Sequence, residues 1–231
     1  MECISVFDML KIGVGPSSSH TLGPWRAGER WIAELKEEGL FEQVTSIKVH
    51  VYGSLSLTGK GHATDLAILL GLSGADPEYI PIDTIDGIVN TIKTEHIINF
   101  NGERQLDFNF KEGIVFHRDF LPFHANGLTF EARLDSGATS SETYYSIGGG
   151  FVVKEELIHA KENLKTLKTF PFPTQKGTEL LDYCHQENAS ISEIVLENER
   201  SLRSEEEIDR ELHRIWDTML ECMYTGCHTE G

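Results

Sequence analysis

The sequence has only four cysteines among 231 residues, and no two of them form a Cys-x-x-Cys pair. This spacing excludes the dense disulfide framework of small secreted domains and predicts reduced thiols. Cys222, Cys227 and His228 could supply part of a metal site, but zinc and iron–sulfur centres need further ligands at suitable distances along the chain. We therefore expect no metal site within this chain.

Long apolar runs are also lacking. No stretch approaches the roughly 20 residues that a membrane-spanning helix requires. Met1, Glu2 and Cys3 lead directly into Ile4, without the basic segment and long apolar core of a signal peptide. These absences predict a cytoplasmic protein that has no membrane partner.

Basic side chains are scarce, because 20 lysines and arginines stand against 37 aspartates and glutamates. The formal net charge of −17 argues against a nucleic-acid partner, since phosphate binding depends on accumulated positive charge. Much of the acidity lies in residues 193–211. There, Ser204 and the three glutamates that follow it are typical of a helix start, so we interpret the region as solvated helix surface.

What the sequence does contain is a polar stretch at residues 15–21, Gly-Pro-Ser-Ser-Ser-His-Thr, with four hydroxyls and one imidazole. Pro16 fixes its own φ and disfavours a helical Gly15, and successive serines favour local hydrogen bonds. The stretch is therefore expected to be a loop. A helix cap needs one hydroxyl, whereas several hydroxyls and backbone N–H groups at a helix start suit an anionic or carboxylated ligand.

A second polar stretch, residues 53–62, follows an alternating strand pattern at residues 44–52. If extended, it places Ser54, Ser56 and Thr58 on one side, ahead of a Gly-Lys-Gly turn. A helix is then expected from His62 onward. Strand, glycine turn and helix together predict an anion-binding geometry.

Familiar nucleotide and hydrolase motifs do not fit either stretch. A P-loop fails because Gly53 lies six residues before Gly59, and Gly61 stands where Ser or Thr should follow the lysine. A dinucleotide-binding loop fails because Ser18 stands where a third glycine is needed. A Gly-x-Ser-x-Gly elbow, typical of α/β-hydrolases, is missing as well.

Residue periodicity predicts an α+β fold, with a mixed or antiparallel sheet and packed helices in an N-terminal domain and an all-helical C-terminal segment. Helices are expected over residues 25–40 and 85–92. The middle of the chain is expected to be antiparallel sheet, with Asn126-Gly127 as a hairpin signal. A last helix is expected over residues 205–224, stopped by Gly226.

The sequence Phe-Pro-Phe-Pro at residues 170–173 is a break in composition and the best domain boundary. It predicts one domain over residues 1–168. A linker and the helical start of a second domain are expected over residues 169–231.

Three stretches together carry a family resemblance: residues 15–21, residues 52–65 and residues 144–151. Over essentially its whole length, the chain resembles the iron–sulfur-dependent L-serine dehydratases of bacteria. The resemblance implies the N-terminal β domain of the single-chain enzymes plus the opening helices of their catalytic α domain. It also implies that the cysteine ligands of a [4Fe-4S] cluster lie beyond Gly231, so that this chain alone should be inactive.

The activity that the resemblance implies is deamination of L-serine to pyruvate and ammonia, with a protein base removing the α-proton. The implied partners are L-serine and the catalytic α domain of the same protein, and a homodimer is expected. Carried over residue by residue, His62 and His20 become the candidate acid–base pair. The candidate substrate-binding residues are Ser17, Ser18, Ser19, Thr21, Ser54 and Lys60.

Two other functions stay open at this point. The β domain is also similar to the regulatory domain of some phosphoglycerate dehydrogenases, which implies a serine-sensing module without catalytic residues. A purely structural dimerisation domain is the third possibility. An imidazole suits proton transfer near neutral pH, but a histidine is equally able to act as a structural hydrogen-bond donor.

Overall fold

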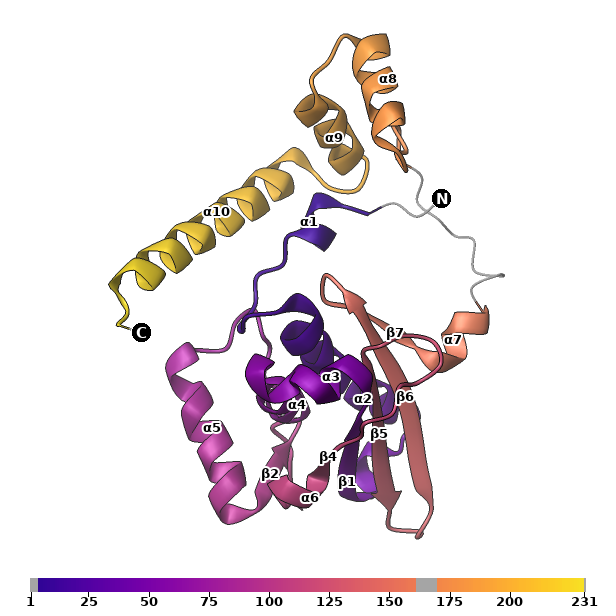
Figure 1. The fold of residues 1–231 in the computed structure, drawn as a ribbon, viewed down its shortest axis with the longest axis vertical. Helices are drawn as coiled ribbons and strands as arrows, with labels where there is room; N and C mark the ends of the chain where they lie inside the picture. Colours follow the sequence, from indigo (N-terminus) through magenta and orange to yellow (C-terminus); the bar gives the residue numbers. More distant parts are fainter. Residues whose placement is uncertain (1–3, 161–169, 231) are drawn as a thin grey trace. The chain divides into compact units, whose positions relative to one another are not determined.

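The computed structural model describes residues 4–160 and 170–230, without the side chains of Lys60, His159 and Ala160. The chain divides into two compact units, Gly13–Lys161 and a second unit formed by Met1–Ile12 with Glu162–Gly231 (Figure 1). Among the described residues, all strands belong to the first unit, and the second is helical. The α+β fold is confirmed. The expected domain boundary after residue 168 falls outside the described residues and stays a prediction.

The first unit is built on a five-stranded mixed sheet in the order β4-β1-β5-β6-β7. Strand β4 runs parallel to β1, whereas the other neighbours are antiparallel. Strands β2 and β3 form a separate antiparallel pair. The strands are β1 (Val44–Val51), β2 (Ile97–Phe100), β3 (Arg104–Asp107), β4 (Ile114–Phe116), β5 (Gly127–Leu134), β6 (Thr139–Gly148) and β7 (Phe151–Lys154).

The hairpin expected at Asn126-Gly127 is wrong. Gly127 begins β5, which pairs with β1 and β6, while the preceding strand β4 pairs with β1 in parallel. The short connection from β5 to β6 lies instead around Gly137, whose φ is +84°. Strand β4 is parallel to β1, and parallel strands are joined by a long crossover rather than by a tight turn. The local turn signal at Asn126-Gly127 therefore did not determine which strand β4 pairs with.

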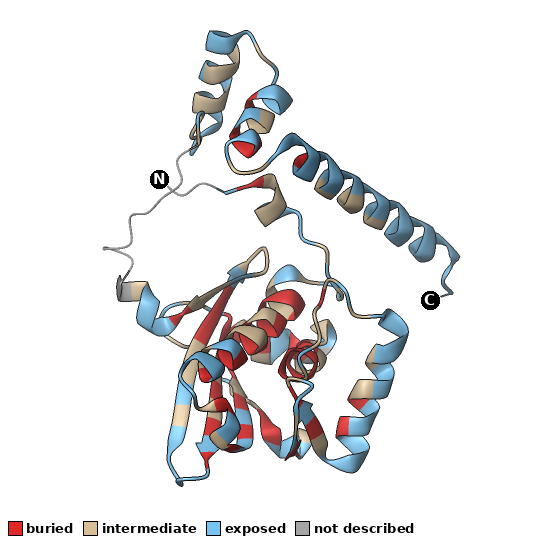
Figure 2. Ribbon diagram, turned by 180° about the vertical axis from the view of Figure 1, so that it is seen from behind, coloured by how far each residue is buried: buried red, intermediate tan, exposed pale blue. Residues whose placement is uncertain are grey.

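Helices α2 and α4 pack together, α2 also packs against β5, β6 and β7 of the sheet, and α4 contacts β2; many buried residues of this unit lie here (Figure 2). Their close approach needs glycine, because a Cβ at Gly71 would lie 2.5 Å from the carbonyl oxygen of Trp25. The helix expected over residues 25–40 is confirmed as α2. The unit contains α2 (Gly23–Glu37), α3 (Gly53–Thr58), α4 (Thr64–Leu72), α5 (Ile82–Glu95), α6 (Phe110–Gly113), α7 (Glu155–Ala160), and short turns η1 (Ser18–Leu22), η2 (Phe41–Gln43) and η3 (Gly59–His62).

Both polar stretches are more helical than expected. Residues 18–22 form a π-helical turn rather than a loop, because the Ser17 hydroxyl accepts a hydrogen bond from the His20 backbone N–H and caps the turn. Residues 53–58 form helix α3 rather than an extended segment. The carbonyl groups of Asp119 and Ala125 accept hydrogen bonds from the first two N–H groups of α3. These partners lie far along the chain, so the residues of the stretch alone could not predict the helix. The helix expected over residues 85–92 is present as α5, which extends further at both ends, over Ile82–Glu95.

A charged network joins α2 to β6 and β7. Lys154 Nζ lies 2.9 Å from Glu34 Oε2 and 3.0 Å from Glu142 Oε2, and the lysine side chain is 9% exposed. Glu34 also accepts hydrogen bonds from Tyr144 Oη at 2.7 Å and from Arg30 Nε at 2.8 Å. Burial raises the pKa of Glu34, but these hydrogen bonds outweigh it and hold the pKa below its usual value.

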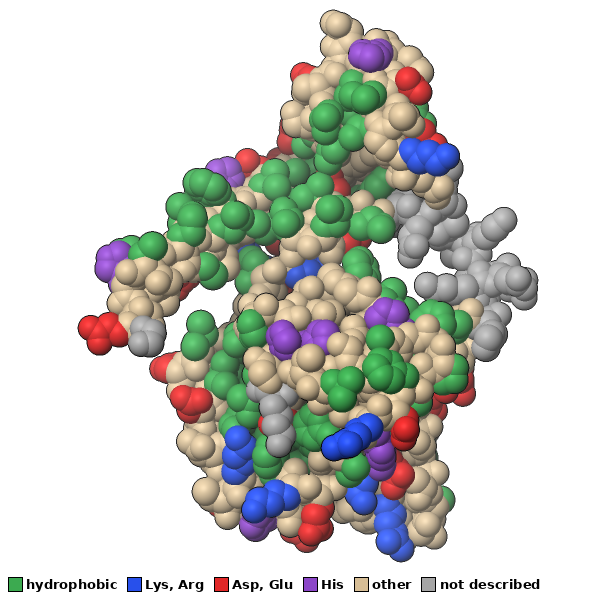
Figure 3. Space-filling view, in the orientation of Figure 1, with side chains coloured by type: hydrophobic (Ala, Val, Ile, Leu, Met, Phe, Trp, Pro, Cys, Tyr) green, Lys and Arg blue, Asp and Glu red, His purple; other side chains and the backbone are tan. Residues whose placement is uncertain are grey.

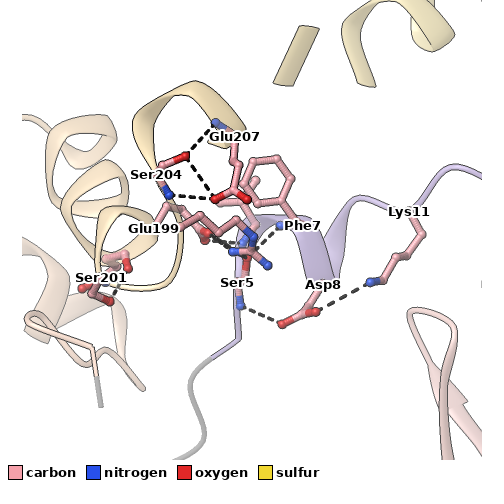
Figure 4. Close-up of polar contacts among 11 residues, drawn as sticks. Ser5, Phe7, Asp8, Lys11, Glu199, Ser201, Ser204 and Glu207 are labelled. Carbon is pink, nitrogen blue, oxygen red and sulfur yellow. Dashed lines mark hydrogen bonds and ion pairs between the residues drawn. The ribbon is translucent and has the colours of Figure 1, made fainter. Parts of the chain in front are cut away.

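In the helical unit, Glu199 connects the N-terminal segment to the C-terminal helices. It is buried, and it accepts hydrogen bonds from Ser5 Oγ at 2.8 Å and from the Val6 N–H at 2.7 Å (Figure 4). Arg203 Nη1 donates to both Ser5 and Glu199. The helices of this unit are α1 (Val6–Met9), α8 (Gly177–Glu187), α9 (Ile191–Arg200) and α10 (Glu205–His228).

The last helix passes Gly226 and ends at His228, so the expected stop at the glycine is wrong. A glycine ends a helix when it adopts a left-handed conformation, and Gly226 is not among the glycines with positive φ. Among the described residues, no helix is both long enough and apolar enough to cross a membrane.

We predict that Lys154→Met lowers the free energy of unfolding by about 3 kcal/mol at neutral pH, because it removes the cation shared by Glu34 and Glu142 and leaves Glu34 with Arg30 alone. Urea unfolding followed by circular dichroism measures this loss. The difference from the wild type should shrink as the pH falls through the lowered pKa of Glu34. Lys36→Met, which breaks an exposed ion pair with Glu103, is the control and should cost much less. Equal losses in the two variants would contradict the prediction.

Candidate functional site

Two threonine hydroxyls bring the two polar stretches together. Thr21 Oγ1 donates to the carbonyl oxygen of His62 at 2.9 Å, and Thr64 Oγ1 donates to the carbonyl oxygen of His20 at 2.7 Å. Both threonines are buried. As a result, the His20 and His62 rings lie with their centroids 4.9 Å apart. Neighbouring histidine side chains are visible at the surface of this unit, near α3 (Figure 3).

His20 bridges two serine hydroxyls. Its Nδ1 lies 2.9 Å from Ser19 Oγ, and its Nε2 lies 3.0 Å from Ser54 Oγ. Burial and the nearby His62 lower the pKa of His20, while a hydrogen bond to the Ser54 backbone raises it in part. The imidazole is therefore neutral near pH 7. In that form, one ring nitrogen donates a hydrogen bond and the other accepts one.

His62 has a different hydrogen-bonding pattern. Its Nδ1 lies 3.0 Å from the carbonyl oxygen of Thr58, and because a carbonyl only accepts, Nδ1 carries the proton. In the neutral ring, the lone pair of Nε2 is then free to accept a proton. The described part of the chain provides no hydrogen-bond partner for that nitrogen, and the side chain is half-buried. His62 is therefore the better placed of the two histidines to act as a base.

The serines of the first stretch lie around His20 in different ways. Ser17 Oγ accepts a hydrogen bond from the His20 N–H at 3.2 Å and lies 3.4 Å from Ser19 Oγ. Ser18 is exposed and contributes its carbonyl oxygen, which accepts from the Gly23 N–H. The structure thus gathers Ser17, Ser19, His20, Thr21, Ser54 and His62. The side chain of Lys60 lies outside the described residues.

Two further residues hold the site and were not singled out from the sequence. Thr64 bonds to the His20 carbonyl, as described above, and Ser146 Oγ donates to the carbonyl oxygen of Ser19 at 2.7 Å. A Cβ at Gly23 would lie 1.9 Å from Ser146 Oγ, so a glycine is needed there. Ser146 lies in residues 144–151, one of the three stretches that carry the family resemblance. The sequence alone carries no signal for its role, because the burial of Ser146 is known only from the structure.

The described residues do not provide a metal centre. No group of three His, Cys, Asp or Glu side chains among them could hold a metal ion. Cys184, Cys222 and Cys227 are free thiols in the helical unit. The [4Fe-4S] cluster implied by the sequence resemblance therefore does not fit the residues described here, and its ligands would have to come from elsewhere.

Comparison with known proteins identifies the family. Residues 5–157 match the family model described as serine dehydratase beta chain. The chain belongs to this family. Relatives of this serine dehydratase beta-chain member include L-serine dehydratase 1 of Escherichia coli, 44% identical over 229 residues, and an L-serine dehydratase of Haemophilus influenzae, 44% identical over 231 residues. An L-serine dehydratase of Streptomyces coelicolor is 43% identical over 230 residues.

Each of these alignments covers 99% of this chain and 50% of the relative. The chain thus spans about half the length of the curated relatives that it matches. The family resemblance expected from the sequence is confirmed. The family model covers all the residues gathered at the candidate site, whereas α8, α9 and α10 lie beyond its end.

We predict that NMR titration of the imidazole ¹³Cε1 signals will show His20 with a pKa below the ordinary histidine value. His62→Gln should raise the pKa of His20, because it removes a second positive charge that disfavours protonation. An unchanged His20 titration in His62→Gln would show that the two rings do not interact in solution.

Proposed function

We propose that this chain is the β domain and the first helices of the α domain of an L-serine dehydratase, which converts L-serine to pyruvate and ammonia. The observation that carries the proposal is Nε2 of His62, which has no hydrogen-bond partner among the described residues, beside the hydroxyl-bound imidazole of His20. Membership of the serine dehydratase beta-chain family and the names of the relatives support the choice of substrate.

In this proposal, the side chains divide the work of β-elimination. His62 Nε2 accepts the α-proton of serine, and the electron pair of the broken C–H bond forms the double bond as the β-hydroxyl leaves. The proton taken up by His62 is returned to the leaving hydroxyl, which departs as water. The neutral His20, hydrogen-bonded to Ser19 and Ser54, relays this proton by accepting one on one ring nitrogen as it gives up one from the other. The resulting aminoacrylate becomes an imine, and water hydrolyses it to pyruvate and ammonia.

The substrate-binding role falls to the hydroxyl-rich turn. A serine carboxylate is an acceptor only, so it suits the hydroxyl donors of Ser17, Ser18, Ser19 and Thr21, with Ser54 across from them. Thr21 already donates to the His62 carbonyl, so its contribution is to position the turn. We assign Lys60 to balancing the substrate charge, as the resemblance implies.

The rest of the active site is proposed to lie outside this chain. A [4Fe-4S] cluster would supply a Lewis acid when bound, and we propose that its cysteine ligands lie beyond Gly231, in the catalytic α domain of the same protein. The twofold greater length of the relatives supports this placement. It follows that the 231-residue chain alone should be inactive, and we propose a cytoplasmic homodimer as the working form.

We predict that His62→Gln in the complete protein, with its cluster intact under anaerobic conditions, lowers kcat for L-serine by about 100-fold or more, the usual contribution of a positioned base. Steady-state pyruvate formation measures the effect, and the cluster absorbance checks the loading. The control is His96→Asn, which removes an exposed histidine of the same unit at a position with φ of +57° that asparagine tolerates. It should leave kcat unchanged.

A near-normal kcat in His62→Gln would overturn the catalytic assignment. Titration of the 231-residue chain with L-serine then separates the remaining functions. Saturable binding at millimolar or lower serine would indicate a serine-sensing domain. No binding, with normal kcat in the complete variant, would indicate a structural domain.

A further inference from the structure

A second pair of histidines lies outside the candidate site. His50 is on β1, where its neighbours Val49 and Val51 are fully buried, so its side chain points to the opposite face of the sheet. His50 Nδ1 lies 2.8 Å from Nε2 of His117, the residue that follows β4. The Tyr52 ring stacks on His117, with centroids 4.6 Å apart and planes 10° from parallel. The pair therefore joins β1 to the segment that leaves β4.

The segment that His117 begins wraps around the start of α3. Its first residue is fixed by a backbone hydrogen bond from the His117 N–H to the Val51 carbonyl at 2.8 Å. Further along, the carbonyl of Asp119 accepts from the Gly53 N–H at 2.9 Å, and that of Ala125 accepts from the Ser54 N–H at 2.8 Å. A Cβ at Gly53 would lie 2.3 Å from the Ala125 oxygen. The segment is thus in close contact with the first turn of α3.

Ser54 is the link between this segment and the candidate site. Its backbone N–H is held by Ala125, and its side-chain oxygen lies 3.0 Å from His20 Nε2. A movement of the segment would displace the Ser54 hydroxyl relative to His20. The path from the second histidine pair to the site therefore runs from His117 along the chain to Ala125, and from there through hydrogen bonds to Ser54 and His20.

We propose that the His50–His117 pair positions Ser54 against His20, and that this positioning is lost when both imidazoles of the pair are protonated. The relevance for serine turnover rests on the proposed function. The structural coupling itself does not.

The proton balance of the pair explains the pH dependence. When one proton lies between Nδ1 of His50 and Nε2 of His117, one nitrogen donates and the other accepts. This hydrogen bond can form both in the neutral pair and in the pair that carries one positive charge. A second proton gives two donors and two like charges across a 2.8 Å contact, so the bond must break. The pair should thus stay closed at neutral pH and open only in acid.

The charged groups around the pair set where opening occurs. Burial, then the charge of His117, lower the pKa of His50; Glu131 on β5, 3.9 Å from His50 Nε2, raises it, and Lys48 on β1 lowers it. Arg118 and Asp119 follow His117 in the chain. When folding lowers the pKa of a histidine, its contribution to stability is fully present at pH values above the pKa of the unfolded chain. The contribution is lost as the pH falls through the pKa of the folded protein. Opening is therefore expected below the usual range of histidine titration.

The test measures amide hydrogen exchange of Gly53 and Ser54 by NMR in the 231-residue chain, between about pH 7.5 and about pH 4.5, corrected for intrinsic rates. The amide of Phe130, in the centre of the sheet, reports global opening. In the wild type, lowering the pH should reduce the protection of the two amides by about five- to tenfold relative to Phe130. This is the factor by which the loss of one hydrogen bond changes an equilibrium constant. In His50→Val, protection should be low at both pH values.

His50→Asn is the conservative variant. An asparagine side chain can place an amide donor or acceptor near the position of Nδ1 and does not titrate, so it can bond to either form of His117. It should restore protection at both pH values and abolish the pH dependence. The control, His96→Asn, should retain the wild-type behaviour.

The same pH dependence in His50→Asn as in the wild type would overturn the proposal, as would unchanged protection in His50→Val. The exchange experiment is carried out without added L-serine, so its outcome does not depend on serine turnover. If the kcat of His62→Gln were normal, the coupling of His50 to Ser54 could still be observed. If the exchange were independent of pH, His62 could still be the base.

Discussion

The candidate site depends on one reciprocal pair of hydrogen bonds, from Thr21 to the His62 carbonyl and from Thr64 to the His20 carbonyl. Thr21 belongs to the first polar stretch and Thr64 lies two residues after the second, so together the two bonds fix how the stretches lie against each other. Both threonines are buried, and water therefore competes little for their hydroxyls. This constraint places two imidazoles within contact distance although they lie 42 positions apart in the sequence.

The surrounding fold supports this arrangement by allowing backbones to approach closely. Gly71 lets α4 contact Trp25 of α2, and Gly23 leaves room for Ser146, which bonds to the Ser19 carbonyl. The site therefore combines a π-helical turn, the end of a 3₁₀ turn and a sheet strand. Its hydroxyls and imidazoles are held by elements whose own positions the hydrophobic core determines.

Much of this could be predicted from the sequence, and the failures have physical causes. The alternation of Val49, His50 and Val51 indicated the strand, and the two hydroxyl-rich stretches indicated the site. Helix α3 could not be predicted from its own residues, because its first N–H groups are satisfied by Asp119 and Ala125, far along the chain. For the same reason, the parallel pairing of β4 and the contact between His50 and His117 follow from tertiary structure alone.

The most direct test of His62 as the base is the pH dependence of kcat/KM for L-serine in the complete protein, compared between the wild type and His62→Gln. A base that must be unprotonated predicts an acid limb on which kcat/KM falls about tenfold per pH unit. This limb should be absent from the residual activity of the variant. An identical acid limb in both proteins would contradict the assignment and place the base on another group.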